Sequence, residues 1–80
     1  MIDLETQEKL QINIDGDAGP YLMVPLQQLP DLRVLLQQKL IPHTVDEDAI
    51  QFDDRPVIAI VNFGRGADPV RLQRLLDETD

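Results

Sequence analysis

The sequence contains no cysteine and no serine. Without cysteine, disulfide bonds, thiolate metal sites and thiol catalysis are excluded. Without serine, a nucleophilic triad would have to use one of the few threonines, and hydrolase chemistry of the usual kind has no nucleophile. We therefore expect a protein that is not an enzyme, with no catalytic residues and no cofactor.

Basic residues are also few: 7 stand against 15 acidic residues, which gives a net charge of −8. Such a charge repels the phosphates of nucleic acids and anionic membrane surfaces, so a basic or neutral protein is the more plausible partner. Long hydrophobic runs are missing too, and none approaches the roughly 20 residues of a membrane span. The acidic start of the chain lacks the pattern of a signal peptide, and we expect a cytoplasmic protein.

What is present predicts one small domain over residues 1–80. A composition of 42% hydrophobic residues is typical of a globular chain. A domain of this size buries little surface, so a second subunit would help to stabilise it. We expect residues 1–8, which carry many charges, to fray or to lie along the surface.

The most informative stretch is a run of β-branched and aromatic residues at 57–63, followed by a glycine turn. Such a run predicts a central strand that is buried on both faces. Asp68 and Pro69 then predict a helix N-cap and first turn. Leucines at 72, 75 and 76 would give this helix one apolar face toward the sheet.

The same joint has the layout of an anion site, because free N–H groups and the positive end of a helix dipole converge there. Arg65 and Arg71 would add counter-charges. The alternative is a connecting turn with a good cap, since the glycines do not form a complete nucleotide-binding motif. The candidate ligand-binding residues are Gly64, Arg65, Gly66, Asp68 and Arg71.

Earlier in the chain, alternating apolar residues predict a strand over residues 9–14, and residues 21–24 predict a second one that pairs with it. Pro30 and Asp31 begin a helix, and residues 26–29 add a turn before it. Val34 points away from the apolar stripe of this helix, and Gln27, Gln28, Gln37 and Gln38 supply much of its polar face. The stripe consists of Leu29, Leu32, Leu35, Leu36 and Leu40.

Residues 43–52 predict either one long strand with a bulge or two short strands. A turn at 53–56 then leads into the central strand, and the two should form an antiparallel hairpin. The element order is ββαββα. We predict an α+β fold, a two-layer sandwich in which two helices cover one face of an about four-stranded, mainly antiparallel sheet.

The passage from the leucine helix through Leu40-Ile41-Pro42 into the next strand resembles small ferredoxin-like bacterial domains, known as signal-transducing or uncharacterised proteins, over residues 21–76. The resemblance implies a ferredoxin-like variant of this fold. A full domain of that type ends in a further strand after Leu76. We expect the sheet edge left open without that strand to pair with a second copy, which gives a homodimer.

One histidine, His43, precedes a group of carboxylates. A histidine with several carboxylates can bind a divalent ion or act as an acid and base pair. Aspartates in turns, however, are usually exposed to solvent, and we therefore expect no metal site. The carboxylates are Asp46, Glu47, Asp48, Asp53 and Asp54.

These acids contrast with Arg65, Arg71 and Arg74 near the end of the chain. One interpretation is a solvated helix face, with Arg74 paired to Glu78. The other is charge complementarity between copies, or toward another protein, through the acidic residues and Arg74. Our first hypothesis is thus a non-enzymatic interaction or regulatory module of unknown partner. The second is a small-molecule sensor that binds an anion at residues 64–69.

Overall fold

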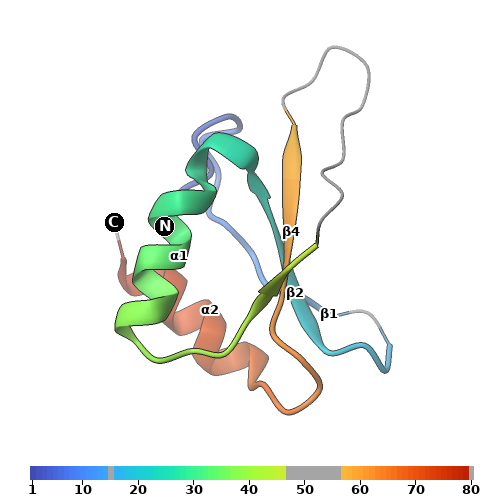
Figure 1. Ribbon diagram of the computed structural model, residues 1–80. Coiled ribbons are helices and arrows are strands. Elements are labelled where there is room, and N and C mark those ends of the chain that lie inside the picture. Colours follow the sequence, from blue (N-terminus) through green and yellow to red (C-terminus); the bar gives the residue numbers. More distant parts are fainter. Residues whose placement is uncertain (15, 47–56, 80) are drawn as a thin grey trace.

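The computed structural model describes residues 1–14, 16–46 and 57–79. Within these ranges both helices lie against the same face of one sheet (Figure 1). This is the two-layer α+β fold that the sequence predicts. In chain order the elements are β1 (Asn13–Ile14), β2 (Pro20–Pro25), the 3₁₀ turn η1 (Leu26–Gln28), α1 (Leu29–Gln38), β3 (Thr44–Val45), β4 (Ile58–Asn62) and α2 (Pro69–Glu78).

The sheet is antiparallel, and its strand order is β1-β2-β4-β3. At its centre β2 and β4 place Leu22 opposite Val61. Thr44 of β3 lies opposite Asn62 of β4, which is the antiparallel pairing expected for this half of the chain. The turn predicted at residues 53–56 lies outside the described residues.

The buried core residues of the two central strands belong to the sheet face that the helices cover; on the other face the terminal residue of β2, Pro25, is also buried. Leu22, Val24, Ala59 and Val61 are at most 2% exposed. On the opposite face every described residue of β4 is only half-buried. The prediction that the central strand is buried on both faces is therefore wrong, because both helices pack on one side.

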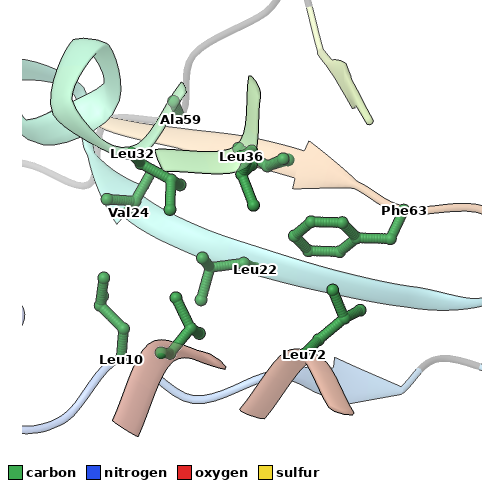
Figure 2. Packing of buried hydrophobic residues seen from close by; sticks show 10 residues of the cluster. Leu10, Leu22, Val24, Leu32, Leu36, Ala59, Phe63 and Leu72 are labelled. Carbon is green, nitrogen blue, oxygen red and sulfur yellow. The ribbon is translucent and has the colours of Figure 1, made fainter. Parts of the chain in front are cut away.

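The core is a single cluster between the sheet and the two helices (Figure 2). Each helix contributes two buried leucines that are four residues apart, as expected from the apolar periodicity: Leu32 and Leu36 in α1, and Leu72 and Leu76 in α2. Its buried members are Leu10, Leu22, Val24, Leu32, Leu36, Ala59, Val61, Phe63, Leu72 and Leu76.

Helix α1 follows the expected turn η1, and Val34 points outward as predicted. Leu40 does not join the buried stripe, however, and is 88% exposed. The helix ends at Gln38, and Leu40 takes a left-handed φ of 56°, which turns its side chain away from the core. The N–H groups of Leu40 and Ile41 donate to the carbonyls of Gln37 and Leu36, the pattern of a Schellman motif, in which glycine is the usual residue at the left-handed position.

Strand β1 is shorter than predicted and comprises only Asn13–Ile14. Before it, the Leu10 carbonyl and the Ile12 N–H form hydrogen bonds with the side chain of Gln73, and the Leu10 N–H donates to the carbonyl of Met1. β1 nevertheless lies beside β2, where it pairs with Pro20 and Tyr21. We expected the sheet edge beside β2 to pair with a second copy. In the structure β1 of the same chain occupies that edge.

The first residues of the chain are held against η1 by Gln28. Its side-chain nitrogen donates to the carbonyl of Ile2 at 2.6 Å, and its side-chain oxygen accepts from the N–H of Leu4 at 3.1 Å. Gln28 is 5% exposed, so its assignment to the polar face of the helix is wrong. Its polar atoms are satisfied by backbone more than twenty residues away, which a helical pattern does not reveal.

Candidate functional site

The joint between β4 and α2 is built on a close approach of two backbones. Gly64 follows the strand with a φ of 86°, and Gly19 in the β1–β2 turn has a φ of 90°. A Cβ atom on Gly19 would lie 2.5 Å from the carbonyl carbon of Gly64. Only glycine fits at position 19, and the two turns are fixed against one another.

Asp68 caps α2 as predicted. Its Oδ1 atom accepts the backbone N–H of Val70 at 3.0 Å and that of Arg71 at 3.4 Å. Two of the free N–H groups of the first turn are therefore already bonded to a carboxylate. An anion near this joint would have to rely chiefly on side chains.

The five residues predicted to bind a ligand do not share one cavity. Arg65 lines a shallow hollow of about 390 Å³ together with Asp17 and the β1–β2 turn. Gly66, Asp68 and Arg71 line a different pocket, of about 660 Å³, on the other side of the joint. Arg65 and Arg71 thus line two different hollows, which meet at Ala67.

The 660 Å³ pocket, called here the joint pocket, lies between the α1–β3 connection and the first half of α2. Lys39 and Arg71 bring positive charge to it from two different elements. Lys39 and Leu40 were not among the predicted site residues, because nothing in the sequence pattern brings the end of α1 next to the start of α2. The apolar lining consists of Leu40, Ile41, Pro42, Phe63, Ala67, Leu72 and Leu75.

Arg74, predicted to serve in an interaction, lines a third hollow, which it shares with Ile12, Ile14 and Val70 beside β1. Arg65 lies in the turn before α2, and Arg71 and Arg74 lie on the helix. The three arginines line three different hollows. They do not form one basic patch.

Of the predicted acidic residues, the structure describes Asp46, and Glu47, Asp48, Asp53 and Asp54 lie outside the described residues. The Oδ1 atom of Asp46 accepts the side-chain amide of Asn62 at 2.7 Å, and the Asp46 N–H donates to Ile60 at 2.9 Å. The His43 Nδ1 atom donates to the carbonyl of Ile41 at 2.9 Å. Within residues 1–14, 16–46 and 57–79, no three His, Cys, Asp or Glu side chains are grouped as a metal ion requires.

The sheet face away from the helices is called here the open face. The strand register places on it a central apolar group, Tyr21, Met23, Ile58 and Ile60. Met23 is 43% exposed. The same register adds Asn13, Thr44 and Asn62 at one end of this face.

Comparisons with protein-family models, with curated proteins and with solved structures return no match for this chain. In the part of the chain that the structure describes, no helix has the length and apolar character needed to cross a bilayer. The open face and the joint pocket are therefore interpreted from their own geometry.

Proposed function

We propose that the chain is a non-enzymatic interaction module that acts as a homodimer, with the open face of its sheet as the interface. The observation that carries the proposal is the apolar group at the centre of this face, which the helices leave uncovered. A sheet with apolar residues on both faces is normally covered on both. Sheet-on-sheet packing between two copies would bury the group.

The charge distribution favours a second copy as the occupant. Two chains of net charge −8 repel one another, so a surface of low charge favours their association. The described strand residues of the open face carry no carboxylate, and Asp46, which directly follows β3, already accepts a hydrogen bond from Asn62. Charged residues lie beside the face near the chain's start, where Asp3, Glu8 and Lys9 line a hollow together with Met23 and Ile58. An identical face brings the same apolar and amide groups to the interface.

The expected ferredoxin-like character and a cytoplasmic location are part of the same proposal. In chain order β2, α1, β3, β4 and α2 follow the first five elements of the β-α-β-β-α-β motif, and β1 lies at the edge beside β2. Fractionation of cells that express the tagged chain tests the location.

The mass of the protein in solution, measured by light scattering from low to high micromolar concentration, tests the homodimer. We expect a dimer whose population rises with concentration, and Met23→Lys should yield a folded monomer because a charge would be buried in the interface. Val34→Lys is the matched control, since Val34 is 52% exposed on the helix layer and should leave the dimer unchanged. A wild-type chain that is monomeric throughout, or a Met23→Lys dimer as stable as the wild type, contradicts the proposal.

A further inference from the structure

The joint pocket lies on the helix side of the sheet, opposite to the open face. Its lining of charged and apolar residues differs from that of the open face, so we expect a different kind of binding partner. Its volume of about 660 Å³ lies within the range of small-molecule sites. Phe63 and Leu72, which reach its wall from the core, are only 7% and 6% exposed. The apolar wall is therefore held in place by core packing without a ligand.

From the joint pocket we infer a second site: it binds a small amphipathic carboxylate, that is, an apolar chain or ring that carries one carboxylate group. Lys39 and Arg71 would receive the carboxylate, and the apolar body would lie against Phe63 and Leu72. This ligand class goes beyond the interaction function proposed above and does not depend on it.

Charge complementarity supports an anion. The chain has 7 basic residues against 15 acidic ones, yet this pocket is lined by two basic residues and one acid. That acid, Asp68, already accepts two backbone N–H groups at the start of α2. Lys39 and Arg71 both line the pocket and are both exposed, so their side chains can turn toward a ligand without giving up a buried position.

The apolar lining indicates that the anion carries a hydrophobic body. A simple phosphate or acetate ion would gain nothing from Phe63, Leu72 and their apolar neighbours. Leu40 gives independent support, because it combines 88% exposure with a left-handed φ of 56° at the rim of the pocket. An exposed leucine at a position that favours glycine costs free energy in the unliganded protein, and contact with an apolar ligand would offset that cost.

The test is an NMR titration of the full-length ¹⁵N-labelled chain with decanoate below its micelle concentration. Parallel titrations use decanol, which lacks the charge, and inorganic phosphate, which lacks the apolar body. We expect decanoate to shift the backbone amides of residues 39–41, 63–68 and 70–72 in a saturable way. Decanol and phosphate should each bind at least about tenfold more weakly, since each lacks one of the two recognised parts.

Variants separate the pocket from general electrostatics. Lys39→Gln combined with Arg71→Gln should weaken decanoate binding about tenfold. The control combines Arg33→Gln in α1 with Arg74→Gln in α2, which makes the same change of net charge from exposed positions outside the pocket lining. It should change the affinity by less than about twofold.

Leu40→Gly should weaken binding about threefold in a protein that remains folded, because it removes apolar contact at the rim. The inference is overturned if decanoate leaves these amides unshifted, if decanol or phosphate binds equally well, or if the two double variants behave alike. Shifts confined to Met23 and Ile60 would place the ligand on the open face and overturn it as well.

Discussion

The side-chain oxygen of Gln73 in α2 accepts the backbone N–H of Ile12 at 2.8 Å, across 61 residues of sequence. The nitrogen of the same side chain donates to the carbonyl of Leu10 at 3.1 Å and to Asp77 at 3.0 Å. One glutamine amide thus satisfies the two backbone groups that a neighbouring strand would otherwise bond. It ties the segment before β1 to the second helix.

Gln73→Ala should lower the free energy of unfolding by about 1–3 kcal/mol, because it leaves a partly buried N–H and C=O without partners. Urea unfolding measures the loss, and faster hydrogen exchange at Ile12 should accompany it. Gln37→Ala, at an exposed position of α1, is the control and should stay within about 0.5 kcal/mol of the wild type. Equal effects of the two substitutions would mean that the hydrogen bonds of Gln73 to Leu10 and Ile12 contribute nothing to stability.

Gly19→Ala should destabilise the protein by about 2–4 kcal/mol, since alanine would meet both a positive φ and the backbone of Gly64. Thermal unfolding followed by circular dichroism measures the change. Gly66→Ala is the matched control. A Cβ at Gly66 meets open space, and its φ is not in the left-handed range, so alanine should be neutral or stabilising by about 0.5 kcal/mol. A tolerated Gly19→Ala would show that the two turns can separate.

The fold class and most elements could be predicted because they depend on local signals. Asp68 and Pro69 mark the start of α2, Pro25 closes β2, and the leucine spacing identifies the face of each helix that packs on the sheet. These residues act within a few positions of one another, so the sequence pattern is enough.

The candidate site depended instead on contacts between distant segments. Nothing near Lys39 indicates that it shares a pocket with Arg71, and nothing near Gln28 indicates a partner at Ile2. The left-handed φ of Leu40 was equally hidden, because leucine is a rare choice for such a position. A periodic pattern assigns a face of a helix, whereas these features arise only when the helices pack.

Asp68→Ala should cost about 1 kcal/mol, because the first turn of α2 loses the acceptor for two N–H groups. Asp68→Asn keeps an oxygen in the same place and should cost less than about 0.5 kcal/mol. Chemical unfolding distinguishes the two. Asp31→Ala in the first turn of α1 is a further control. No side chain caps that helix, so this substitution should lower the free energy of unfolding by less than Asp68→Ala does. If asparagine proved as damaging as alanine, the carboxylate charge would matter more than the cap.

Leu40→Gly should raise the free energy of unfolding by about 0.5–1 kcal/mol, which corresponds to roughly 2–8 °C in Tm for a domain of this size. Leu40 is 88% exposed, so little packing is lost, and glycine adopts the φ of 56° without strain. Leu26→Gly gives the contrasting control: Leu26 is also exposed but is not among the described residues with positive φ, so glycine there should destabilise by about 1 kcal/mol. Differential scanning calorimetry distinguishes the expected rise in Tm for Leu40→Gly from the expected fall for Leu26→Gly. A loss of stability in Leu40→Gly would mean that the leucine contributes to the fold itself, and its exposure at the joint pocket would then need no ligand to account for it.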